Sequence, residues 1–216
     1  ALIKAVVDIH GTQKVFEFLD RVPPGTSHTF LSDSYSLSFD KNTLFDTLYL
    51  RAKHEMDSTT GRDIFELPDH IYPLKKDIGV EFIAKGVYDS LDGYHVYSYD
   101  NPSYPSYVGG AINNNKVSFS AYGMGKYTLL KDTIPPVITS QGVSKNIIRL
   151  RMLDDLSGID NFEARLNGKW LLMHYEPKRN MVWSERLNKN KALTGEFEFR
   201  VTDKAGNESI LTLNLE

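Results

Sequence analysis

The chain has 216 residues, of which 41% are hydrophobic and 12% aromatic, and its formal net charge is −3. Because it contains no cysteine, disulfides, thiol catalysis and cysteine-bound zinc are excluded, and the weak net charge leads us to expect no nucleic-acid partner. No apolar run approaches the ~20 residues that a spanning helix needs, so we expect no membrane span.

Apolar and polar residues alternate with a period of two along much of the chain. Ile148, Leu150 and Met152, for example, are separated by Arg149 and Arg151. Such alternation is typical of antiparallel strands with one buried and one wet face. The sequence therefore predicts an all-β fold of two tandem antiparallel β-sandwich domains, the second immunoglobulin-like, preceded by a β-hairpin remnant.

Residues 1–22 are predicted to be a β-hairpin. Its Asp8-x-x-Gly11 segment matches Asp203-x-x-Gly206 near the end of the sequence, and an alternating strand follows each. In such turns Asp bonds the local backbone and Gly supplies a positive φ. We interpret the segment as the tail of an upstream immunoglobulin-like domain. Since a lone hairpin is marginally stable, Phe16 and Phe18 should dock on the next domain or on a partner chain.

The next domain is predicted over residues 30–132 and the immunoglobulin-like one over 137–216. Pro135-Pro136 marks the boundary, because two consecutive prolines interrupt a strand ladder. The last domain holds seven strand candidates, at 137–141, 146–153, 161–167, 169–175, 180–186, 195–202 and 208–215, a number that suits an immunoglobulin-like sandwich. At least one of Trp170 and Trp183 is expected in its core, with a binding role as the alternative.

A tyrosine-rich stretch in the first domain is the main candidate for a ligand site. It contains Tyr94, Tyr97, Tyr99, Tyr104 and Tyr107. Tyrosine offers an apolar ring with a polar tip, which suits stacking against a glycan. The alternative is cross-strand aromatic pairing around a hairpin.

An acidic loop in the last domain is the only candidate metal site. It brings Asp154, Asp155 and Asp160 close in sequence, and Asp203 could join them at the end of the sandwich. Calcium takes six to eight oxygen ligands in loops of this kind. The alternative is an ordinary turn in which Asp and Ser bond the local backbone.

Several segments resemble one family. DTIPPVI, MLDDLSGIDNFEARLNGKWLLMHYEPKRN and FRVTDKAGN resemble the C-terminal β region of secreted Bacteroidetes proteins that carry a lysostaphin/LytM-type zinc metallopeptidase domain upstream. SYSLSFDKNTLFDTLYL, IYPLKKDIGVEF and AYGMGKYTLLKD are similar to the middle β domain of the same proteins. The resemblance implies a secreted or cell-envelope protein acting on peptidoglycan, with the upstream catalytic domain as partner.

The resemblance also implies zinc ligands that this chain lacks. In the family, two His and one Asp from a His…Asp and a His-x-His motif hold the metal, whereas here the histidines are single: His10, His28, His54, His70, His95 and His174. We therefore expect no catalytic residues and no cofactor. The chain would be a non-catalytic accessory region that positions or tethers the peptidase. The alternative is a cell-surface glycan-binding or adhesion module with no enzyme attached.

Overall fold

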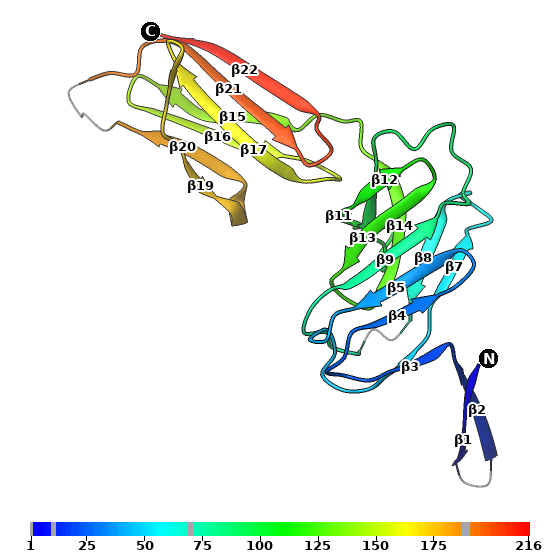
Figure 1. Ribbon diagram of the computed structural model, residues 1–216. Coiled ribbons are helices and arrows are strands. Elements are labelled where there is room, and N and C mark those ends of the chain that lie inside the picture. Colours follow the sequence, from blue (N-terminus) through cyan, green and yellow to red (C-terminus); the bar gives the residue numbers. More distant parts are fainter. Residues whose placement is uncertain (1, 10–11, 69–70, 187–190) are drawn as a thin grey trace. The chain divides into compact units, whose positions relative to one another are not determined.

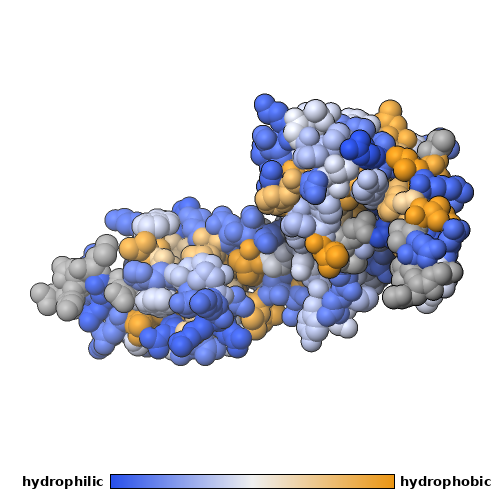
Figure 2. Space-filling model, turned by 90° about the horizontal axis from the view of Figure 1, so that it is seen from below, coloured by the Kyte–Doolittle hydropathy of each residue, from blue (hydrophilic) through white to orange (hydrophobic). Residues whose placement is uncertain are grey.

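The computed structural model describes residues 2–9, 12–68, 71–186 and 191–216 (Figure 1). It divides into a first unit, Ala1–Lys131, and a second unit, Asp132–Glu216. Antiparallel strands dominate both, and in the described ranges the only helical segment is the 3₁₀ turn η1 (Pro177–Arg179). The predicted all-β class is confirmed. On the face drawn in Figure 2, hydrophobic patches are interrupted by hydrophilic residues.

The chain begins with the hairpin of β1 (Ile3–Ile9) and β2 (Thr12–Phe18). Its predicted Asp8–Gly11 turn lies partly outside the described residues. Phe18 packs on Tyr49 with ring centroids 5.2 Å apart, as expected for docking. Phe16, by contrast, stays 41% exposed, so within the chain only part of the expected contact forms.

Two five-stranded antiparallel sheets form the body of the first unit, next to a short pair of β3 (Asp20–Val22) with β6 (Leu48–Leu50). In spatial order, one sheet contains β11 (Ser106–Gly109), β10 (Tyr94–Ser98), β14 (Gly125–Lys131), β8 (Asp63–Leu67) and β7 (Lys53–Met56). The other contains β12 (Ala111–Asn113), β13 (Lys116–Ala121), β9 (Ile78–Ile83), β5 (Tyr35–Phe39) and β4 (His28–Leu31).

Three phenylalanines join the two sheets at the centre of this unit. Phe65 of β8 and Phe82 of β9 stack with centroids 5.9 Å apart, and Phe119 of β13 meets both edge-on. Alternation along β8 and β9 turns every second side chain inward, which is why these rings meet. Each buried ring contributes roughly 1.5–3 kcal/mol to folding.

The second unit is a sandwich of two four-stranded antiparallel sheets. In spatial order, one contains β15 (Val137–Ser144), β16 (Ile147–Leu153), β20 (Met181–Glu185) and β19 (His174–Glu176). The other contains β18 (Lys169–Trp170), β17 (Ile159–Leu166), β21 (Gly195–Asp203) and β22 (Glu208–Leu215). Its core includes Ile148, Leu150, Val182, Phe197 and Phe199, none of which is exposed.

The predicted strand 169–175 is two strands in different sheets. Asn167 and Gly168 take φ values of 52° and 74°, which makes the tight turn that pairs β18 with β17. The chain then crosses to pair β19 with β20. Because β18 is a two-residue edge strand, Trp170 is 67% exposed. Trp183 is only half-buried, so the expectation that at least one tryptophan belongs to the core is wrong.

Candidate functional site

The tyrosine-rich stretch does not form one aromatic platform. Tyr97 on β10 is buried beneath an edge-on contact with Tyr107 of β11, their centroids 5.4 Å apart. Tyr107 in turn bonds Nδ1 of His95 through its hydroxyl, at 3.3 Å. Tyr104 is 79% exposed in the connecting loop. Cross-strand pairing thus accounts for Tyr97 and Tyr107, whose side chains project from the same face of the sheet.

The two remaining tyrosines of the set, Tyr94 and Tyr99, differ in their contacts. The backbone N–H of Tyr99 donates to the carbonyl of Lys126 at 2.7 Å, which ties the end of β10 to β14. Tyr94, half-buried, meets Tyr88 edge-on at 5.1 Å, and the ammonium of Lys131 lies 5.8 Å from its ring centroid. Of the five tyrosines, Tyr94 lines a cavity of the first unit.

That cavity is a polar cleft of about 520 Å³ in the first unit. We call it the Tyr94 cleft, and its lining residues are Asp89, Ser90, Leu91, Asp92, Gly93, Tyr94, His95, Gly110, Ile112, Asn114 and Asn115. Gly110 forms part of its wall at a φ of 93°, where an added Cβ would lie 2.8 Å from the carbonyl oxygen of Ser118. Only glycine fits there, so the backbone itself shapes this wall.

The Tyr94 cleft presents acceptors without partners. Among the described residues, no hydrogen bond or ion pair engages the carboxylates of Asp89 and Asp92. The backbone around them is fixed, since Asp92 N–H donates to Ser90 Oγ at 3.1 Å and Tyr94 N–H to the carbonyl of Leu91. A ligand that donates several hydrogen bonds beside an aromatic ring would therefore match the cleft.

The acidic loop of the second unit gathers a different set of carboxylates from the predicted one. Asp154 and Asp203 come together as expected, each with a carboxylate oxygen within 4.8 Å of one from Asp132. Asp155 and Asp160 are exposed and lie outside this group. Asp132 precedes the prolines of the domain boundary, and nothing in the local sequence pairs it with the loop.

Local donors already occupy these three carboxylates. Asp154 Oδ2 accepts from the N–H groups of Leu156 and Gly158, and Asp132 Oδ2 accepts from Ser157 N–H. Both oxygens of Asp203 accept from Asn207, each at 2.8 Å. The arrangement cross-links the loop, β21 and the start of the unit, and these donors compete with any cation for the same lone pairs.

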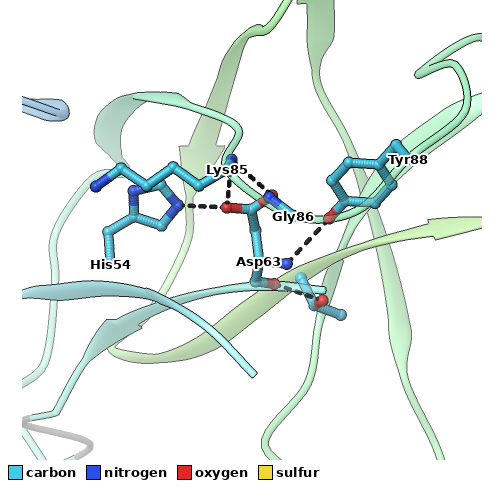
Figure 3. Close-up of polar contacts among 6 residues, drawn as sticks. His54, Asp63, Lys85, Gly86 and Tyr88 are labelled. Carbon is cyan, nitrogen blue, oxygen red and sulfur yellow. Dashed lines mark hydrogen bonds and ion pairs between the residues drawn. The ribbon is translucent and has the colours of Figure 1, made fainter. Parts of the chain in front are cut away.

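A buried histidine–aspartate pair inside the first unit escaped sequence reasoning. His54 Nε2 lies 2.7 Å from Asp63 Oδ1, and neither side chain is exposed. The backbone N–H groups of Lys85 and Gly86 donate to the same carboxylate, and the hydroxyl of Tyr88 accepts from Asp63 N–H (Figure 3). His54 and Asp63 are only nine positions apart and project inward from adjacent strands, which is the signal that could have found them.

Hydrogen bonding decides the charge of Asp63. Burial raises its pKa, but the bonds from His54, Lys85 and Gly86 outweigh burial and hold the pKa below the ordinary value of 3.8. Burial also raises the pKa of Tyr88 well above its usual range. Because His54 lies against the rings of Phe65 and Phe82 and is shielded from solvent, the pair is suited to holding β7, β8 and the 85–88 segment together rather than to meeting a substrate.

Two solved structures resemble this chain at low sequence identity. The apo expansin of Clavibacter michiganensis is 18% identical with a TM-score of 0.29, over 47% of this chain and 46% of its own. A polysaccharide lyase is 9% identical with a TM-score of 0.26, over 100% of this chain and 39% of its own. The chain thus spans less than half the length of either protein.

None of the curated proteins matches this chain. The Zu5-like domain, by contrast, matches residues 22–132, which is just over half of the sequence and covers the body of the first unit. The Tyr94 cleft and the His54–Asp63 pair both lie within the matched range. The chain therefore belongs to the Zu5-like domain family.

Proposed function

We propose that this chain is a non-catalytic, glycan-binding β region of a larger exported bacterial protein, and that the Tyr94 cleft is its binding site. The observation that carries the proposal is the cleft's composition. It combines the carboxylates of Asp89 and Asp92, which have no partner among the described residues, with the amides of Asn114 and Asn115 beside a tyrosine ring.

Sugars match such a lining chemically. Each ring carries several hydroxyls that donate to carboxylates and amides, and it has apolar C–H edges that pack on aromatic side chains. The cleft volume of about 520 Å³ lies within the roughly 300–1,000 Å³ usual for small-molecule sites. Because two carboxylates line the cleft, Coulomb repulsion disfavours acidic sugars. The cleft should therefore take a neutral sugar.

The wider role is inferred from the resemblance of the sequence to the β region of proteins that carry a lysostaphin/LytM-type zinc metallopeptidase domain. If the chain adjoins a cell-wall metallopeptidase, its glycan is the neutral amino sugar of peptidoglycan, and its partner is the catalytic domain of the same protein. Binding would then hold the catalyst on an insoluble substrate in the periplasm or at the outer surface. The alternative is an adhesion module that uses the same cleft with no enzyme attached.

In the described ranges, no helix has the length and apolarity to span a membrane.

The direct test is calorimetric titration of the full chain with chitotetraose, a neutral amino-sugar oligomer, together with co-sedimentation on insoluble peptidoglycan. We expect saturable binding in both. Replacing Asp89 and Asp92 together by Ala should weaken chitotetraose binding at least tenfold, because each charged hydrogen bond contributes about 1.5–3 kcal/mol.

The matched control removes two carboxylates elsewhere. Asp155→Ala with Asp160→Ala changes the net charge equally at exposed positions of the second unit, and it should leave binding unchanged. Absence of binding to chitotetraose and to peptidoglycan would overturn the proposal. Equal losses in the two double variants would show that net charge, rather than the cleft, governs binding.

A further inference from the structure

The outer face of the β15–β16–β20–β19 sheet carries a second, chemically different cavity. Ile148, Leu150 and Val182 point into the core, so alternation turns Arg149 of β16 and Trp183 of β20 outward. The register places Arg149 opposite Trp183, and Trp183 opposite His174 of β19. An arginine, a tryptophan and a histidine therefore form one row across three strands.

Trp183 holds a fixed position in this row. Its ring stacks on His174 with centroids 5.4 Å apart and an interplanar angle of 19°. Beside it lies a cavity of about 370 Å³ lined by Arg149, Glu176, Arg179, Met181 and Trp183. We call this the Trp183 cavity. Because Trp183 is only half-buried although it belongs to a central strand of the sheet, part of its indole surface is left for a ligand.

The end of the 3₁₀ turn η1 supplies another wall of the Trp183 cavity. Glu176 caps the turn by accepting from Lys178 N–H at 3.2 Å. Asn180 ends it in the left-handed region, at a φ of 52°. The turn therefore fixes the backbone of Arg179 next to the sheet, so this guanidinium and that of Arg149 line one cavity.

The arginines of this face lack the partners that arginines have on the other sheet of the same unit. There, Arg165 pairs with Glu163 at 2.8 Å, and Arg200 pairs with Glu208 at 2.7 Å. Here, no described carboxylate forms an ion pair with Arg149 or Arg179. Among the residues that the structure describes, Glu176 is the only acidic one lining the cavity, so two guanidiniums face one carboxylate.

We propose that the Trp183 cavity binds a sugar that carries a carboxylate, such as a hexuronic acid. A guanidinium forms a bidentate pair with a carboxylate, and the indole covers the C–H face of the ring. Glu176 is placed to accept from sugar hydroxyls. The proposal is independent of the Tyr94 cleft, because it rests on other residues and on the opposite charge preference.

Tryptophan fluorescence provides the test in the full chain. Trp170→Phe leaves Trp183 as the only tryptophan, and the replaced side chain is 67% exposed, so the fold should tolerate the change. This variant is titrated with tri-galacturonic acid and, in parallel, with its methyl ester, which has the same sugar without the charge. We expect a saturable fluorescence change with the acid and at least tenfold weaker binding of the ester.

Two substitutions and one matched control then locate the site. In the Trp170→Phe background, Arg149→Gln and Arg179→Gln should each weaken acid binding about tenfold. Arg151→Gln removes the same charge from the same face but outside the cavity lining, and it should change binding less than twofold. Far-ultraviolet circular dichroism checks that all variants are folded.

Four outcomes would overturn the proposal. They are no fluorescence change with tri-galacturonic acid, equal affinity for acid and ester, equal losses in Arg149→Gln and Arg151→Gln, and stronger binding of a poly-glutamate peptide than of the acid sugar. The double change Asp89→Ala with Asp92→Ala should leave this titration unaffected. A negative result for the Trp183 cavity would therefore leave the proposal for the Tyr94 cleft untouched.

Discussion

Two hairpins with the same sequence pattern end up in opposite environments. Both place Asp-x-x-Gly between alternating strands, at Asp8 in the β1–β2 hairpin and at Asp203 in the β21–β22 hairpin. In the second, β21 also pairs with β17, and Phe199 is fully buried. In the first, β1 and β2 pair only with each other among the described strands, and Phe16 is 41% exposed.

The difference teaches that the local pattern makes the hairpin while the neighbouring strands make the core. The apolar face of β1–β2 is formed by Ile3, Ala5, Phe16 and Phe18, because Ala5 lies opposite Phe16 and Ile3 opposite Phe18. The other face carries the exposed Lys4–Glu17 ion pair. Both hairpins are therefore amphipathic. Among the described strands, a second sheet covers the apolar face of β21–β22 but not that of β1–β2.

The largest expected effect comes from matched truncations in the two hairpins. Phe199→Ala should lower the free energy of unfolding of the second unit by about 3–5 kcal/mol, because it leaves a cavity in a closed core. Phe16→Ala should cost less than about 1 kcal/mol, since little core packing is lost. Urea unfolding followed by circular dichroism measures both, and comparable losses would contradict the comparison.

A second test extends the contrast between buried and exposed sites to charge. Asp63→Asn should lower the free energy of unfolding of the first unit by about 3 kcal/mol, because it breaks the buried pair of Asp63 with His54. The exposed Lys4–Glu17 pair of the hairpin should be dispensable, so Glu17→Gln should leave the unfolding midpoint unchanged.

The buried His54–Asp63 pair predicts how acid affects the stability of the first unit. The folded-state pKa of Asp63 lies below 3.8, so its contribution is fully present above about pH 5. That contribution is lost as the pH falls below the unfolded-state value and through the folded one. Urea midpoints between pH 6 and pH 2 should therefore fall less steeply in Asp63→Asn than in the parent chain, and equal slopes would contradict this assignment.

The smallest effect should be local release of the first hairpin. Phe16→Ala with Phe18→Ala removes the contact with Tyr49, so residues 1–20 should be cut faster by trypsin while the second unit stays intact. The matched control is Val6→Ala with Val15→Ala on the opposite, exposed face, which should not change the rate. Equally fast cutting of the parent chain would show that the hairpin is not held by these rings.

Sequence reasoning reached the strands more easily than the sites. Alternation along residues 148–152 and 197–201 predicted both faces of those strands, because a period of two is a local property of extended chain. The split of 169–175 between two sheets was missed, since which neighbour a short strand pairs with depends on the whole sandwich. Trp170, which stands at the end of the first of these two strands, is consequently exposed.

The candidate sites show the same division. Tyr94 was a predicted ligand residue, yet its cleft partners Asn114 and Asn115 lie on another segment that the local sequence does not link to it. Asp132 likewise joins Asp154 and Asp203 from outside the acidic loop. The unpaired Arg149 reads as an ordinary solvent-facing residue until the register sets it beside Trp183.

By itself, the sequence determined the all-β class and the two amphipathic hairpins, because these follow from side-chain alternation and turn chemistry within a few residues. Only the tertiary structure decided which apolar faces are covered, which carboxylates meet, and which arginines lack a partner. Those outcomes depend on strand order and register between segments far apart in sequence. The same Asp-x-x-Gly hairpin can therefore close a core in one unit and remain largely exposed in the other.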